Sequence, residues 1–207
     1  MFSRYKKLSK KHRGNIEWAI FLGVVIFLYA TGLHVEVIGR LQGLIVQTGL
    51  RQPDTSPANN NLPNTSYAMT LTTLDGQRVP LSNFQDKTVF LNFWATWCPP
   101  CIAEMPDIHT LYQHEAAKDV AFVMVSVDKD LDKLKSFLKR KGYTFPVYRL
   151  AGGVPAELYS KSVPTTIVIA PKGQLMMKHE GIASYNTQSF RNFLQQVNAG
   201  KPSALQQ

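Results

Sequence analysis

The first pronounced hydrophobic pattern of the chain is a run from Trp18 to Leu33, which contains no charged residue over 16 positions. As a helix this run rises by roughly 24 Å, slightly less than a hydrocarbon core of about 30 Å. Trp18 and Tyr29 suit the two membrane interfaces. The pattern predicts a transmembrane signal anchor over residues 15–33. A cleaved secretory signal peptide is the alternative, and the weak cleavage sequence at residues 30–32 argues against it.

A second, shorter pattern covers residues 34–50, where the helical spacing separates polar from apolar positions. The polar stripe consists of Glu36, Arg40, Gly43 and Gln47, and apolar side chains occupy the other stripes. This pattern predicts an amphipathic juxtamembrane helix that lies on the bilayer or against a membrane partner. A simple continuation of the anchor is the alternative. Residues 51–66 are rich in Pro, Asn, Ser and Thr and predict a flexible linker.

From Tyr67 to residue 200, short apolar segments alternate with amphipathic ones. The expected elements, in chain order, are a β-hairpin around Asp75-Gly76, a buried strand at 88–95, a helix at 99–117, a buried strand at 120–128, a helix begun by Asp130 and ended by Gly142, two strands within 165–181 and a closing helix at 186–198. This order predicts an α/β fold with a central mixed sheet flanked by helices. Residues 201–207 form a short C-terminal tail.

The net charge of +9 is concentrated at the N-terminus. Residues 1–14 form a basic tail with six cations, namely Arg4, Lys6, Lys7, Lys10, Lys11 and Arg13. From residue 65 onward, 15 Lys and Arg face 11 Asp and Glu, an ordinary soluble surface that gives no indication of a nucleic-acid partner. The cations before the apolar run predict a single-pass protein of the cytoplasmic (inner) membrane. Its N-terminus would lie in the cytoplasm and its globular domain outside, in the periplasm.

The only two cysteines, Cys98 and Cys101, lie where the first buried strand is expected to meet a helix. The first N–H groups of a helix have no partner within it, so Pro99 and Pro100 lose little hydrogen bonding there. The same N–H groups and the helix dipole favour a negative charge on Cys98, which lowers its pKa and makes it a nucleophilic thiolate. Cys101 follows one turn later on the same face. A disulfide can therefore close and reopen while the helix stays in place.

Two other uses of the cysteine pair are less consistent with the sequence. A zinc site needs four ligands, and none of the five histidines stands in ligand spacing with the pair. A structural disulfide across so short a loop would gain little from restricting the unfolded chain. We therefore expect a redox pair, with no metal and no cofactor.

The segment FLNFWATWCPPCIAEMP and the later VPTT loop resemble the TlpA/ResA-like, membrane-tethered branch of the thioredoxin superfamily. The resemblance covers roughly Tyr67 to Asn198. It implies a thioredoxin-like fold with an N-terminal β-hairpin, and a thiol–disulfide oxidoreductase that faces outside the cytoplasmic membrane. It also implies that Val163-Pro164 is a cis-proline loop that faces the cysteines and binds substrate through the Val163 backbone. A trans proline that merely starts a strand is the alternative.

Two further residues near the pair are candidates for the site. Glu104 stands three residues after Cys101, where this branch carries an acidic residue, and it could take the proton of Cys101 if burial raises its pKa. An exposed first-turn glutamate that complements the helix dipole is the alternative. Trp97, directly before Cys98, is expected to contribute an apolar docking surface for substrate, with core packing as its alternative.

The expected mechanism begins with attack of the Cys98 thiolate on a substrate disulfide, and Cys101 then resolves the mixed disulfide. We predict a reductase of disulfides in exported proteins, and the resemblance points to apocytochromes c and cytochrome c biogenesis. A thiol-transporting membrane protein would supply the electrons. A disulfide-forming oxidase and a copper-binding chaperone are the alternatives. Sco-like copper chaperones have three residues between their cysteines and a distant histidine ligand, whereas this chain has two residues between them.

Overall fold

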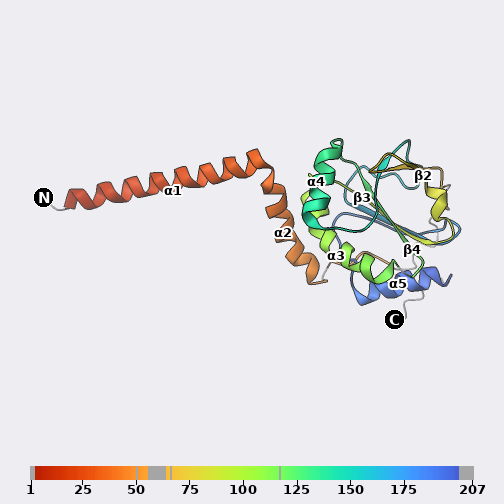
Figure 1. Cartoon of the computed structure of the whole chain (residues 1–207). Helices are drawn as coiled ribbons and strands as arrows, with labels where there is room; N and C mark the ends of the chain where they lie inside the picture. The colour runs from red at the N-terminus through yellow and green to blue at the C-terminus, as the bar shows by residue number, and fades with distance from the viewer. Residues whose placement is uncertain (1–2, 50, 56–63, 66, 117, 201–207) are drawn as a thin grey trace. The chain divides into compact units, whose positions relative to one another are not determined.

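The computed structural model describes residues 3–49, 51–55, 64–65, 67–116 and 118–200 (Figure 1). The chain divides into two compact units, Met1–Ile38 and Gly39–Gln207. The first contains helix α1 (Ser3–Thr31) and the start of helix α2 (Leu33–Gln47). The predicted anchor therefore shares one helix with the described part of the basic tail. The break before α2 falls at Gly32, whose φ of 72° is a backbone conformation that glycine adopts readily.

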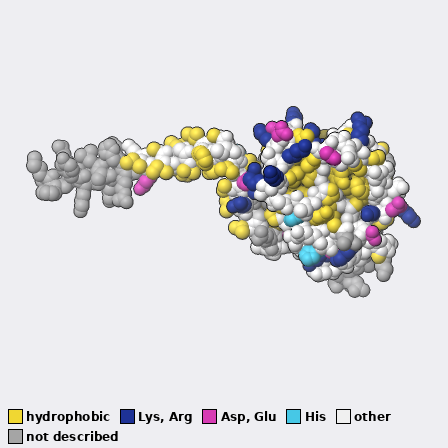
Figure 2. Space-filling view, in the orientation of Figure 1, with side chains coloured by type: hydrophobic (Ala, Val, Ile, Leu, Met, Phe, Trp, Pro, Cys, Tyr) yellow, Lys and Arg dark blue, Asp and Glu magenta, His cyan; other side chains and the backbone are white. Residues whose placement is uncertain are grey.

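The large apolar side chains of α1 are exposed on its surface (Figure 2), among them Trp18, Phe21, Ile26 and Tyr29. Within the described residues, no single helix is both long and apolar enough to cross a membrane. The segments Asn15–Thr31 and Leu33–Val46, bent by 96° at their break, together meet the same test by length and composition.

The second unit is built on one mixed sheet of seven strands in the order β2-β1-β5-β4-β3-β6-β7. The strands are β1 (Thr70–Thr73), β2 (Arg78–Pro80), β3 (Thr88–Trp94), β4 (Val120–Ser126), β5 (Val147–Leu150), β6 (Thr165–Ile169) and β7 (Leu175–Glu180). Strand β3 is central and fully buried, parallel to β4 and antiparallel to β6. The carboxyl ends of β3 and β4 therefore lie side by side.

Three helices cover one face of this sheet, namely α3 (Pro99–Glu115), α4 (Leu131–Lys141) and α5 (Gln188–Asn198). Aromatic contacts tie each of them to it. Ring centroids are 5.3 Å apart for Tyr112 and Phe122, 5.8 Å for Trp94 and Phe137, and 6.1 Å for Phe90 and Phe190. Residues two apart on a strand share a face, so Phe90 and Trp94 point to the same side.

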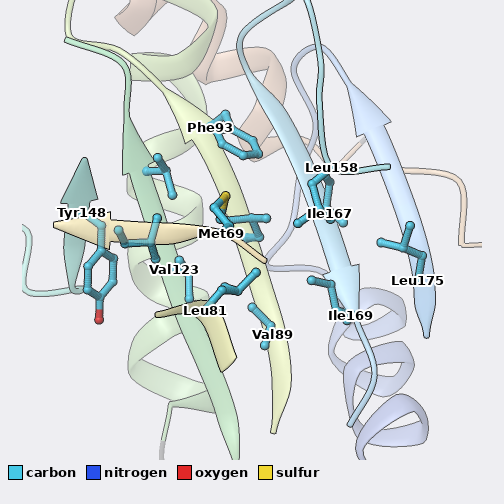
Figure 3. Packing of buried hydrophobic residues seen from close by; sticks show 13 residues of the cluster. Met69, Leu81, Val89, Phe93, Val123, Tyr148, Leu158, Ile167, Ile169 and Leu175 are labelled. Carbon is cyan, nitrogen blue, oxygen red and sulfur yellow. The ribbon is translucent and has the colours of Figure 1, made fainter. Parts of the chain in front are cut away.

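The opposite face of the sheet buries a second hydrophobic cluster, which is mainly aliphatic (Figure 3). Val89, Leu91 and Phe93 of β3 lie in it, together with residues of β4 and β6. Met69 precedes β1, and Leu81 comes from the short 3-10 helix η2 (Leu81–Phe84). The α/β architecture with its N-terminal hairpin confirms the predicted thioredoxin-like fold.

Local signals placed most element ends correctly. Asp130 caps α4 by accepting from the N–H groups of Asp132 and Lys133, and Gly142 ends the helix with a φ of 70°. Strand β5 was not among the elements expected from the sequence. A strand of four residues has too little pattern of its own, and β5 exists through its pairing with β1 and β4.

The second unit includes the end of α2, where Gly39 and Gly43 lie close to α3. The described ends of the predicted linker are also held by the domain. The Arg51 carbonyl accepts from Ser184 N–H at 2.6 Å, and Thr65 N–H donates to the Gly173 carbonyl at 2.8 Å. Residues 56–63 lie outside the described part of the chain.

Candidate active site

The two cysteines lie at the junction of β3 and α3. Cys98 is the N-cap residue of α3, and Pro99 and Pro100 occupy its first helical positions, as the sequence predicted. Cys98 and Cys101 form a disulfide in this structure. Cys98 retains 4% of its surface exposed whereas Cys101 retains none, so only Cys98 can be reached from solvent without movement of the helix.

The Cys98 sulfur has two neighbours that bear on its chemistry. Cys101 N–H donates to Cys98 Sγ at 3.2 Å, and the Val163 carbonyl oxygen lies 3.7 Å from the same sulfur. A disulfide sulfur carries no hydrogen, so the second is a contact here; a reduced thiol could donate across it. The Val163-Pro164 bond is cis, as the resemblance implied. Folding thus brings this loop, 65 residues away along the chain, against Cys98.

A carboxylate that the sequence analysis did not single out fixes the loop before Cys98. Asp128, which is buried, accepts from Thr96 N–H at 2.9 Å, from the Thr96 hydroxyl at 2.6 Å and from the Ser126 hydroxyl at 2.7 Å. The signal was present in the sequence, since Asp128 is the last residue of the second buried strand predicted at 120–128 and lies two residues beyond the end of β4. That strand is parallel to β3, so their carboxyl ends meet at one edge of the sheet.

Glu104 is completely buried, which excludes the exposed first-turn alternative. Its Oε1 accepts from Asn92 Nδ2 at 3.0 Å, and its Oε2 lies 3.5 Å from Ala183 N–H. Asn92 Nδ2 also donates to Thr166 Oγ1 at 2.9 Å. Burial raises the pKa of the Glu104 carboxyl well above its ordinary value, against the smaller lowering effect of the Asn92 hydrogen bond. A proton on Glu104 is therefore held to higher pH than on an exposed glutamate.

Apolar surface surrounds the exposed side of the pair. Trp97 is 58% exposed, which excludes the core-packing alternative, whereas Trp94 is buried. Val163 also lines a cavity of about 170 Å³. Its lining is mainly apolar and includes Phe93, Val127, Leu150, Val154, Tyr159 and Val163.

The structure therefore brings together Cys98, Cys101 and the Val163-Pro164 loop, with Trp97 exposed beside them and Glu104 buried on the next turn of α3. Within the described ranges, no group of three or more His, Cys, Asp or Glu side chains is placed to hold a metal ion. The arrangement can accept or release two electrons by opening and closing one disulfide.

Comparison with protein families finds one model, Redoxin, that matches residues 57–189. The thiol-disulfide oxidoreductase ResA of Bacillus subtilis is 31% identical over 147 residues, which cover 70% of this chain and 80% of that protein. ResA of Bacillus thuringiensis subsp. konkukian is 35% identical over 112 residues, 54% of this chain. That match spans 65% of the relative, just under two thirds of its length.

Solved structures agree with the fold. A thiol:disulfide interchange protein of the thioredoxin family from Chlorobium tepidum superposes with a TM-score of 0.52. The superposition covers 71% of this chain and 96% of that one, with 24% sequence identity. At this identity the similarity concerns the fold alone.

Proposed function

Because the chain belongs to the Redoxin family and is related to thiol–disulfide oxidoreductases, we propose that it is a membrane-tethered reductase of disulfides in exported proteins. The observation that carries this proposal is the placement of Cys98 at the start of α3, paired with a fully buried Cys101. The first-turn N–H groups favour a thiolate on Cys98, and the difference in exposure separates an attacking from a resolving sulfur.

The catalytic cycle transfers two electrons from the dithiol to the substrate. The Cys98 thiolate attacks one sulfur of a substrate disulfide, so that bond breaks, a mixed disulfide forms and the other substrate sulfur leaves as a thiolate that takes up a proton. Cys101 then loses its proton and attacks Cys98 Sγ, which releases the second substrate thiol. The enzyme is left with the Cys98–Cys101 disulfide, the form in this structure. In this scheme Glu104 exchanges the proton of Cys101.

Substrate would dock around the Val163 loop. The Val163 carbonyl beside Cys98 Sγ can accept a hydrogen bond from an extended peptide laid across the cysteine. The neighbouring apolar cavity and the exposed ring of Trp97 would take apolar side chains of that peptide. Unfolded exported proteins with exposed disulfides fit such a site, and the motif resemblance favours apocytochromes c among them.

We infer the reducing direction from the electron supply that a dithiol reductase needs. A dithiol in an oxidising compartment must be supplied with electrons through the membrane, and a tether keeps it beside a membrane donor. The apolar run of α1 and the basic residues before it support anchoring in the cytoplasmic membrane with the domain outside. A disulfide-forming oxidase needs no such supply.

The reduction potential of the Cys98–Cys101 pair tests the direction. For the full chain in detergent, equilibrated with glutathione buffers, we expect a potential below about −200 mV, more reducing than protein disulfide isomerase. In cells, trapping with an alkylating reagent should find the pair mostly as free thiols. A potential near the roughly −120 mV of strong oxidants, with the pair mostly disulfide-bonded in cells, would instead establish an oxidase.

Membrane topology is tested by fusing a reporter that is active only outside the cytoplasm after Gln207. We expect the fusion to be active, because the cations before the apolar run hold the N-terminus inside. Replacing the six basic residues of positions 4–13 by glutamine should weaken this orientation. A matched variant with Lys133, Lys135 and Lys139 replaced should not, since these lie far from the apolar run in sequence. Activity only of a cytoplasmic reporter would overturn the topology.

A further inference from the structure

The part of α2 that belongs to the globular unit packs against the active-site helix through a face that includes two glycines. Gly39, Gly43 and Val46 lie one turn apart and are buried. A Cβ added to Gly39 would lie 3.1 Å from the Pro99 carbonyl oxygen, and one added to Gly43 would lie 3.3 Å from that of Ala103. The two helix backbones approach this closely because both positions are glycine.

The contact falls on the turn of α3 that carries the cysteines. Pro99 and Ile102, the residues that a Cβ at Gly39 would meet, directly follow Cys98 and Cys101 in the sequence. The end of α2 is held as well, since the Ser184 hydroxyl donates to the Val46 carbonyl and Ser184 N–H donates to the Arg51 carbonyl. The second half of α2 is therefore part of the body that carries the active site.

The other side of the same helix exposes large aliphatic residues (Figure 2). Leu41 is 63% exposed, Leu44 62% and Ile45 58%. In a simple amphipathic helix on a soluble domain the exposed face is polar, whereas the exposed face of this part of α2 carries large apolar side chains. Small residues face the domain, and the large apolar ones face away from it. Gly43 belongs to the predicted polar stripe, yet in the structure it is buried against Ala103.

We propose that Leu41, Leu44 and Ile45 rest in the boundary between headgroups and acyl chains of the bilayer, and so hold the Cys98–Cys101 site at the membrane surface. This inference rests on the proposed anchoring through α1. Leu41 follows the end of α1 by ten residues, about 15 Å of helix at ~1.5 Å per residue, so an anchored α1 keeps the stripe near the membrane.

Lipid fits the exposed side chains of Leu41, Leu44 and Ile45 better than a protein partner does. The three side chains are aliphatic and offer no hydrogen-bonding group that would select a partner, whereas acyl chains require none. Arg40 is exposed next to Leu41, where a cation can meet lipid phosphate as in interfacial helices. When α2 lies on the bilayer in this way, the domain that carries Cys98 and Cys101 meets a membrane-bound electron donor at a high effective concentration.

Photocrosslinking of the full chain in vesicles of phosphatidylethanolamine and phosphatidylglycerol tests whether α2 contacts lipid. The photoreactive residue p-benzoylphenylalanine replaces Leu44, and in separate samples Val24 of α1 or the exposed Gln77 of the β-hairpin. We expect lipid adducts at positions 24 and 44 and none at 77, read as mass shifts of the peptides. An adduct at 24 without one at 44 would overturn this inference and leave the anchoring intact. Absence at both would overturn anchoring as well. A protein adduct at 44 in place of a lipid adduct would also overturn the inference, in favour of a second copy of the chain.

A second measurement tests whether the contact between α2 and the bilayer speeds reduction of the active-site disulfide by a membrane-bound donor. In the variant Leu41→Gln/Leu44→Gln/Ile45→Gln, reduction of the Cys98–Cys101 disulfide by a dithiol attached to a lipid headgroup should slow by roughly three- to tenfold. The dithiol is oxidised to a disulfide in this step as the enzyme disulfide is reduced. Reduction by a soluble dithiol should be unchanged, because no substituted residue touches the cysteines. Equal rates with the lipid-bound dithiol would contradict the proposal.

Discussion

Cys101→Ser is expected to accumulate mixed disulfides with protein substrates, whereas Cys98→Ser is expected to form almost none. Cys98 is the N-cap of α3 and the more exposed of the two cysteines, so it makes the first attack. Without Cys101 the intermediate has no resolving thiol and persists. Both variants should lose multiple turnover with a disulfide substrate, because each step needs one of the two sulfurs.

The adducts are measured by acid quenching of cells, alkylation of free thiols and separation without reductant, followed by mass spectrometry of the trapped partners. The double variant is the matched control, since it keeps the fold and lacks both sulfurs. Equal trapping by the two single variants would reverse or remove the assignment of roles. Trapped partners from outside the cytoplasm would also identify the substrate class.

Glu104→Gln is expected to keep the fold and to slow turnover by about two orders of magnitude, the lower end of the contribution of a positioned acid or base. Glutamine matches the shape of the buried carboxyl but cannot exchange the proton of Cys101. The thiol titration of Cys101 should therefore change along with the rate. Asp132→Asn, an exposed carboxyl on α4, serves as the control. Unchanged rate and unchanged titration would leave Glu104 with a packing role only.

The same substitution should change how stability depends on pH. Burial raises the folded-state pKa of Glu104 above its unfolded value, so between these two values the folded protein binds more protons than the unfolded chain. The free energy of unfolding consequently falls as the pH rises through this window. The Glu104→Gln variant lacks this pH-dependent fall in the free energy of unfolding. At pH 8 it should therefore unfold at a higher denaturant concentration than the wild type, and at pH 4 the difference between the two should be smaller. Urea titrations at both values measure it, and a larger gain at pH 4 would contradict the assigned shift.

Most of the fold was readable from the sequence because the signals are local. The caps of α4 and α5 are side chains that bond N–H groups two or three residues away, so their positions depend on short segments alone. The placement of Cys98 at a helix start is also local, since the prolines that follow permit a helix to begin there. Strand β5 lacked any such signal.

The sequence by itself therefore determined the redox pair, its position at the start of α3, the α/β pattern and the apolar run before the domain. Tertiary structure decided which distant groups surround the pair. The Val163 carbonyl reaches Cys98, and Asp128 holds Thr96, because strands β3, β4 and β6 adjoin in one sheet. Asn92 meets Glu104 because helix α3 packs on strand β3. It likewise decided which face of α2 turns inward. Helical periodicity defines a stripe of positions, but the close approach to α3 that glycine allows selects the stripe that is buried.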